Sequence, residues 1–124
     1  MKLSSEDFDR IVRRAIAGIP SEIRQHLDNV VIAVRKRPTR RILDQLGLPP
    51  GEDPLGYYEG TSLMERSFFS PVDYPGTIFI FQRPLEEMCR TTEELEEEIR
   101  ITVVHEIAHL IGLDEERLGE LGYD

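Results

Sequence analysis

The chain has 124 residues, of which 40% are hydrophobic and 31% are charged, and its formal net charge is −9. This length predicts a single domain over residues 1–124 with a hydrophobic core of its own. The acidic balance argues against a nucleic-acid partner, because neutralising phosphates requires clustered lysine and arginine. No apolar run is long enough to span a bilayer and no signal-peptide pattern opens the chain, so we expect a cytoplasmic protein with no membrane partner.

The N-terminal part of the chain predicts a helix followed by a strand. A cap-like serine, Ser4 or Ser5, precedes apolar residues at helical spacing, and the pattern stops at Gly18 and Pro20. After a further short helical stretch, residues 29–34 (NVVIAV) form an apolar run rich in β-branched side chains. Such a run predicts a short, buried strand.

The segment at residues 35–54 is basic at first and then rich in proline and glycine, so we expect mostly loop. A short helix is expected inside it, at residues 39–47 (TRRILDQLG). The basic run RKRPTRR is most simply a solvated loop, and the alternative is a contact with an acidic partner.

Two more strands are expected before the last helix. Residues 55–60 (LGYYEG) predict the first, residues 61–76 a connection, and residues 77–85 (TIFIFQRPL) the second. Apolar side chains fall on both faces of residues 77–85, which predicts that both faces are covered. One helix, then a few strands and finally a long helix make α+β the expected fold class.

The long helix is expected at residues 91–112. Thr91 and Glu94 have the spacing of a capping box, and further acidic residues crowd the first turns, where the helix dipole favours negative charge. Gly112 is a natural C-terminal stop. A wide apolar arc predicts that the final turns are buried.

Three residues of this helix spell H-E-x-x-H: His105, Glu106 and His109. The two histidines are one turn apart on the same face, so their rings can converge on a single zinc ion. Glu106 is offset by one position, where a general base can take a proton from zinc-bound water. The simpler alternative is a pair of ordinary histidines satisfied by hydrogen bonds, but polar groups gathered on a buried helix favour the metal.

A catalytic zinc takes three protein ligands, so a third is expected after Gly112. If Gly112 ends the helix in a left-handed conformation, the chain reverses and brings a residue two to four places later toward the ion. Glu115 is favoured, because H-E-x-x-H-x-x-G-x-x-H proteins place their third histidine there. Asp114 is the next choice and Glu116 the third, whereas a distant ligand such as His26 has nothing near it that suggests a site.

Three segments resemble the minimal-zincin family of small bacterial zincin-like metallopeptidases: GYYEGTSLMERS, TIFIFQRPLE and TVVHEIAHLIGLDEERLGELGY. The resemblance covers residues 50–124 well and the first helix loosely. It implies a compact α+β zincin core, without the C-terminal subdomain of larger zincins. It also implies zinc held by His105 and His109, with Glu106 as the catalytic residue.

The sequence departs from the metzincins, which carry a third histidine and a methionine-containing turn. Here Glu115 stands at the place of that histidine, and no methionine follows Met88. A di-iron carboxylate protein is excluded, because it needs a second Glu-x-x-His and the sequence has none. The only cysteine, Cys89, disfavours a cysteine zinc site, and no base in the sequence is paired with it.

The leading hypothesis is therefore a zinc-dependent metallopeptidase that hydrolyses peptides or unfolded protein segments, with Glu106 as the general base. A chain this short predicts a shallow site, which a homo-oligomer or a protein partner could complete. The TIFIFQR strand is the expected edge for an extended peptide. For oxyanion stabilisation the sequence offers Tyr57, Tyr58 and Tyr123, although packing is the simpler role for each.

The alternative is a zinc-stabilised, non-catalytic binding module on the same scaffold. A structural site is closed by a fourth protein ligand, which the acidic C-terminal segment could supply. Retention of Glu106 favours the enzyme, because a structural site needs ligands and no base.

Overall fold

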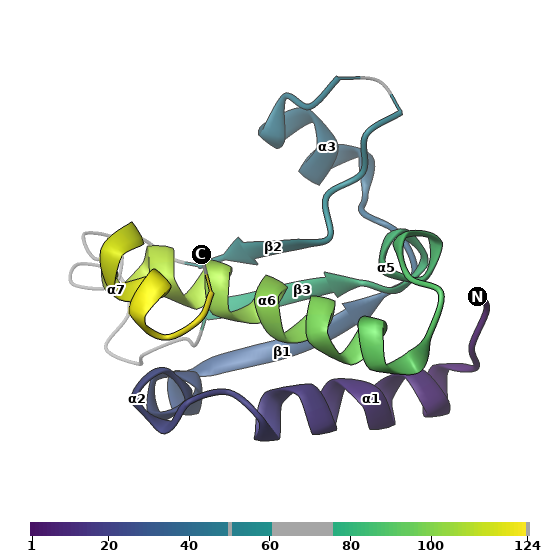
Figure 1. The fold of residues 1–124 in the computed structure, drawn as a ribbon. Helices are drawn as coiled ribbons and strands as arrows, with labels where there is room; N and C mark the ends of the chain where they lie inside the picture. Colours follow the sequence, from purple (N-terminus) through teal and green to yellow (C-terminus); the bar gives the residue numbers. More distant parts are fainter. Residues whose placement is uncertain (50, 61–75, 124) are drawn as a thin grey trace.

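The computed structural model describes residues 1–49, 51–60 and 76–123, and it confirms the α+β class (Figure 1). Its elements in chain order are α1 (Ser5–Ala17), α2 (Ser21–Arg24), the 3₁₀ helix η1 (Gln25–Asn29), β1 (Val30–Arg35), α3 (Arg40–Leu46), β2 (Gly56–Glu59), β3 (Gly76–Phe81), α5 (Gln82–Met88), α6 (Thr92–Ile111) and α7 (Glu115–Glu120). None of the helices in these ranges is long and apolar enough to cross a membrane.

The strands of the described residues form a mixed sheet in the order β1-β3-β2. β1 runs parallel to β3, with Val30 opposite Gly76, and β2 runs antiparallel to β3, with Tyr58 opposite Ile78. Both edges of β3 are therefore paired. The expectation that the TIFIFQR segment offers a free edge to a peptide is wrong, because β1 and β2 are the edge strands of this sheet.

The hydrophobic core lies between one face of the sheet and two helices. Figure 1 shows α6 crossing this face with α1 beside it. Ile78 and Ile80 of β3 have 0% exposure. They share the core with apolar positions of both helices: Phe8, Ile11, Val12 and Ala15 of α1, and Leu95, Ile99, Val103 and Ile107 of α6. The helical spacing seen in the sequence thus marks the faces that are buried.

Two expectations about the strands are wrong in detail. The apolar pattern of residues 77–85 predicts an extended segment throughout, but β3 ends at Phe81 and α5 begins at Gln82. Pro84 lies in the first turn of α5, where a missing backbone N–H breaks no helical hydrogen bond. On the other face of β3, Phe79 is only half-buried, so cover on both faces is not complete.

β1 is an edge strand rather than the fully buried strand that its apolar run predicts. The side chain of Val31 is exposed, and other residues of β1 are only half-buried. The short helix expected at residues 39–47 is confirmed as α3. The connection expected at residues 61–76 lies outside the described residues, apart from Gly76.

The basic run at residues 35–41 begins at the end of β1, and its basic side chains are exposed, as expected for a solvated segment. Some of them also contact other parts of the chain. The Arg35 guanidinium lies 5.5 Å from the centroid of the Phe79 ring. Lys36 Nζ donates to Ser5 Oγ at 3.1 Å and to Gln82 Oε1 at 3.2 Å. These contacts fasten the end of β1 to the starts of α1 and α5.

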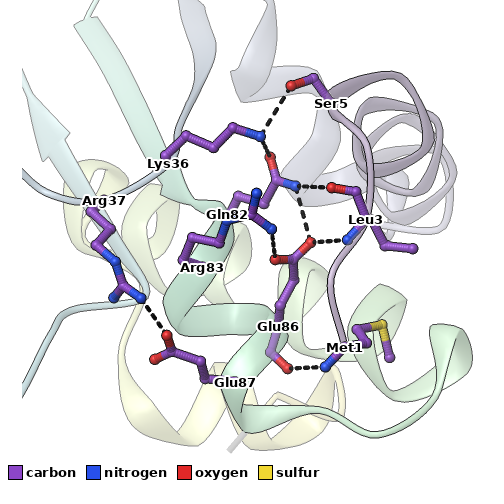
Figure 2. Close-up of polar contacts among 9 residues, drawn as sticks. All are labelled: Met1, Leu3, Ser5, Lys36, Arg37, Gln82, Arg83, Glu86 and Glu87. Atoms are coloured by element: carbon purple, nitrogen blue, oxygen red, sulfur yellow. Dashed lines mark hydrogen bonds and ion pairs between the residues drawn. The ribbon is translucent and has the colours of Figure 1, made fainter.

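Glu86 of α5 forms a buried polar cluster with the segment before α1 (Figure 2). Its side chain is 1% exposed. The backbone N–H of Leu3 donates to Oε2 at 2.8 Å, Gln82 Nε2 donates to Oε2 at 3.0 Å, and Arg83 donates to Oε1 at 2.6 Å. Burial alone would raise the pKa of Glu86, but these donors together lower it below its ordinary value.

Replacing this carboxylate in Glu86→Gln should lower the free energy of unfolding at pH 7 by about 1–3 kcal/mol. Three donors converge on two acceptor oxygens, and the amide of glutamine replaces one of these oxygens with a donor. Because the pKa is lowered on folding, the stability from the ionised group is present above the unfolded pKa of about 4.3 and is lost as the pH falls. Urea unfolding at several pH values measures both effects.

The difference between wild type and Glu86→Gln should therefore shrink below about pH 4. Glu87→Gln is the matched control, because Glu87 is an exposed neighbour that pairs with Arg37 at the surface. A pH-independent loss in Glu86→Gln would contradict the role of the charge.

Candidate metal centre and catalytic base

Both ends of α6 are fixed by local hydrogen bonds, and these position the H-E-x-x-H turns. Thr91 Oγ1 accepts from the N–H of Glu94 at 3.1 Å, as the capping box predicts, while the Glu94 carboxylate accepts from the N–H of Arg90 at 3.1 Å. At the other end Gly112 is left-handed, with φ of 73°, and the N–H of Leu113 donates to the carbonyl of Ala108 at 2.9 Å. The predicted reversal of the chain at Gly112 is confirmed.

Strand β2 approaches α6 closely at Gly56. A Cβ at this position would lie 2.5 Å from Thr102 Cγ2, 3.0 Å from the carbonyl oxygen of Phe79 and 4.0 Å from Glu106 Cγ. Thr102 is itself buried, and its hydroxyl donates to the carbonyl of Glu98 at 2.8 Å. The absence of a side chain at Gly56 therefore brings the backbone of β2 beside the turn that carries Glu106.

Glu106 is half-buried on α6. Burial raises the pKa of its carboxyl group, and the nearby His109, the backbone of Tyr58 and His105 each oppose that rise. Both histidines of the motif thus lie close enough to act on Glu106 electrostatically. The Glu106 carboxyl group is therefore held partly out of water and beside both imidazoles.

His105 is half-buried and His109 is exposed. His105 Nε2 lies 2.8 Å from the carbonyl oxygen of Tyr123. A carbonyl oxygen only accepts, so Nε2 carries the proton and donates, and in the neutral ring Nδ1 keeps its lone pair. An imidazole that donates to a backbone carbonyl through one nitrogen and has a lone pair on the other is the form in which histidine binds metals.

The acidic residues after Gly112 do not join the histidines in a group of three. Asp114 is the N-cap of α7, and its Oδ1 accepts from the N–H of Arg117 at 2.8 Å. Glu115 and Glu116 are exposed in the first turn of α7. Within residues 1–49, 51–60 and 76–123, no three His, Cys, Asp or Glu side chains are grouped to hold a metal ion. The identity of the third ligand stays a prediction.

His26, the distant alternative, is exposed on η1 and belongs to no such group among the described residues. Cys89 is buried, and burial raises the pKa of its thiol, with the charges of Glu98 and Glu94 adding to the rise. A thiol that stays protonated is a poor metal ligand and a poor nucleophile.

The side chains of the three tyrosines named from the sequence contact residues outside the H-E-x-x-H motif. The hydroxyl of Tyr57 donates to Gln45 Oε1 of α3 at 2.9 Å, and Tyr58 packs close to the backbone of Gly76. The ring of Tyr123 is buried in the core, and burial raises the pKa of its hydroxyl. Tyr123 contacts His105 through its backbone carbonyl and not through its ring. A backbone contact of this kind cannot be predicted from the pattern of side chains in the sequence.

The described residues fit the helical half of a zinc site. Two histidines lie one turn apart on α6, the ring of one is held by a backbone carbonyl, and the carboxylate of Glu106 lies close to both. A small mixed sheet packed against a helix of this kind defines the zincin class of metallopeptidase scaffold.

Residues 27–123 match the family model described as a zincin-like metallopeptidase, and the chain belongs to this family. Zincin-like peptidases use zinc in general. A solved structure with a similar fold is that of a conserved hypothetical protein from Thermus thermophilus, with a TM-score of 0.54 and 22% sequence identity over 90% of this chain and 100% of that chain. This likeness shows a shared fold. No curated protein matches the sequence.

Proposed function

We propose that the protein is a zinc-dependent metallopeptidase that hydrolyses peptides or unfolded protein segments in the cytoplasm. The observation that carries the proposal is the half-buried carboxyl group of Glu106, which lies close to His105 and His109 and to the backbone of β2. A site that only binds zinc needs no such carboxylate. Because His109 is exposed and the site lies at the surface, a second copy or a partner protein would complete its walls.

Each residue has a definite task in this proposal. Zinc would be held by His105, His109 and a third ligand, for which Glu115 is the first choice and Asp114 the second. When bound, it would supply Lewis-acid chemistry toward a water molecule and a carbonyl group. The Glu106 carboxylate accepts a proton from the water whose oxygen attacks the peptide carbon. When the carbon–nitrogen bond breaks, Glu106 returns this proton to the leaving amine nitrogen.

The substrate is proposed to lie extended beside β2. This strand is an edge of the described sheet, and at Gly56 its backbone lies next to Glu106. An extended peptide can add to such an edge through backbone hydrogen bonds, which require no particular side chains. β2 therefore takes the role that the sequence pattern assigned to the TIFIFQR segment.

The test combines the zinc content, measured by mass spectrometry, with the cleavage of casein. Wild type should hold one zinc per chain, lose cleavage in a chelator and regain it when zinc is added. His105→Ala and His109→Ala should each lose stoichiometric zinc and cleavage, because each removes an imidazole ligand. His26→Ala, which removes an exposed histidine on η1, is the matched control and should behave as wild type.

The alternative is the zinc-stabilised binding module. Stoichiometric zinc in wild type without cleavage of casein or of any peptide would favour it. Absence of zinc from wild type protein in a zinc-containing buffer would contradict both proposals, and it would leave His105 and His109 as hydrogen-bonding residues.

A further inference from the structure

A hollow of about 260 Å³ lies beside Glu106, between α6 and the start of β2. Leu55 and Gly56 form one wall. The other wall is one face of α6, formed by Glu98, Ile101, Thr102, His105 and Glu106. Sites for whole small molecules usually measure about 300–1,000 Å³. This hollow is smaller, and its size suits a single side chain.

The hollow is lined by two half-buried apolar side chains, Leu55 and Ile101, and by two carboxylates, Glu98 and Glu106. Along α6, Ile101 lies between the two carboxylates. Glu98 precedes Glu106 by eight residues, which corresponds to about 12 Å along the helix. A long side chain that enters near Glu106 would pass over Leu55 and Ile101, and its tip would approach Glu98.

Glu98 has no cationic partner in the part of the chain that the structure describes, in contrast to Glu96 and Glu97. Glu96 pairs with Arg14 at 2.9 Å and with Arg100 at 3.4 Å, and Glu97 pairs with Arg100 at 2.5 Å. The side chain of Glu98 is half-buried at the hollow. A half-buried carboxylate without a counter-charge favours a cation brought by a ligand.

We propose that this hollow is a specificity pocket for a lysine or arginine side chain of the substrate, next to the peptide bond that is cleaved. The proposal rests on the proposed peptidase function. The aliphatic stem of the substrate residue packs on Leu55 and Ile101, and its cationic end binds the carboxylate of Glu98. The net charge of −9 adds a long-range attraction for basic peptides.

The test uses a series of fluorogenic peptides that differ only at this position, with lysine, arginine, norleucine or glutamate. Wild type should cleave the lysine and arginine peptides with a kcat/KM roughly tenfold to a hundredfold above that of the norleucine peptide, as expected for a charge-assisted hydrogen bond. Norleucine keeps the aliphatic stem of lysine, so this ratio isolates the charge. Glu98→Gln should reduce the ratio to about one, and Glu98→Lys should favour the glutamate peptide.

Glu97→Gln is the matched control, because it changes the net charge equally one residue away and does not line the hollow. It should keep the wild-type ratio. An equal kcat/KM for the lysine and norleucine peptides in wild type, or a preference that persists in Glu98→Gln, would overturn the pocket and leave the peptidase proposal intact.

Binding of the same peptides to the Glu106→Gln protein, measured by fluorescence anisotropy, tests the pocket without turnover. The lysine peptide should bind more tightly than the norleucine peptide, and this difference should be lost in the Glu98→Gln/Glu106→Gln double variant. Such a result would support the pocket even if wild type cleaved nothing. Equal binding of the two peptides would overturn it. Failure of the peptidase proposal is recognised separately, by the absence of casein cleavage in zinc-loaded wild type.

Discussion

Glu106→Gln is expected to lower the kcat/KM for casein or peptide cleavage by roughly 10²–10⁴-fold while the zinc content stays that of wild type. The amide of glutamine has nearly the shape of the carboxylate, but it cannot accept a proton from water. Glu106 is also half-buried, and a neutral amide at this position avoids the burial of a charge. The variant should therefore fold as stably as wild type, and thermal unfolding followed by circular dichroism checks this.

The control for this prediction is Glu6→Gln, which neutralises an exposed carboxylate in the first turn of α1. It should leave both cleavage and zinc content unchanged. If Glu106→Gln cleaved casein at the wild-type rate, another group would have to accept the proton, and the role given to Glu106 would be wrong. If the variant lost its zinc, Glu106 would act on the metal rather than on the water.

The helix that carries His105, Glu106 and His109 could be predicted from the sequence because it depends on local rules. The spacing of His105 and His109 follows from the helical repeat, and the helix ends follow from Thr91 and Gly112, whose hydrogen bonds reach only a few residues along the chain. These features are encoded within about 20 residues, so periodicity and capping suffice to find them.

The arrangement of the strands could not be predicted in the same way. β3 pairs with β1 across more than 40 residues, from Val30 to Gly76, and no local pattern states which strand lies in the middle. The start of α5 was hidden for a related reason. The strand expected over residues 77–85 continues past Phe81, where β3 ends. The next residue, Gln82, is buried, and its Nε2 donates to the carbonyl of Leu3 near the start of the chain. A contact this distant in sequence leaves no local pattern.

The third metal ligand is the part of the site where sequence reasoning left several choices. An aspartate after a helix can serve as a metal ligand, as an N-cap or as a solvated group, and a glutamate can serve as a ligand or as a solvated group. Asp114 illustrates the competition, because its carboxylate caps α7. Spacing alone ranks Glu115 and Asp114, whereas the backbone after Gly112 decides which carboxylate turns toward the histidines.

Gly56→Ala is expected to lower the free energy of unfolding by about 1–3 kcal/mol, because the added methyl group overpacks the contact between β2 and α6. A Cβ at this position would lie 2.5 Å from Thr102 Cγ2 and 3.0 Å from the carbonyl oxygen of Phe79, so strand and helix must separate. Glu106 lies on the same helix, and its Cγ atom would be 4.0 Å from the added Cβ. Since a displacement of about 1 Å can cost on the order of 10²-fold in rate, kcat/KM should fall as well.

The double variant Gly56→Ala/Thr102→Ser separates this contact from a general loss of stability. Serine lacks the methyl group that the new Cβ would meet, and it keeps the hydroxyl that donates to the carbonyl of Glu98. Urea unfolding and casein cleavage should both recover in part, with a coupling of roughly 0.5–3 kcal/mol between the two positions. The recovery is incomplete because the carbonyl of Phe79 cannot be removed. Additive effects of the two substitutions would show that β2 does not fix the position of Glu106 through Thr102, and the placement of the substrate beside β2 would then lose its structural basis.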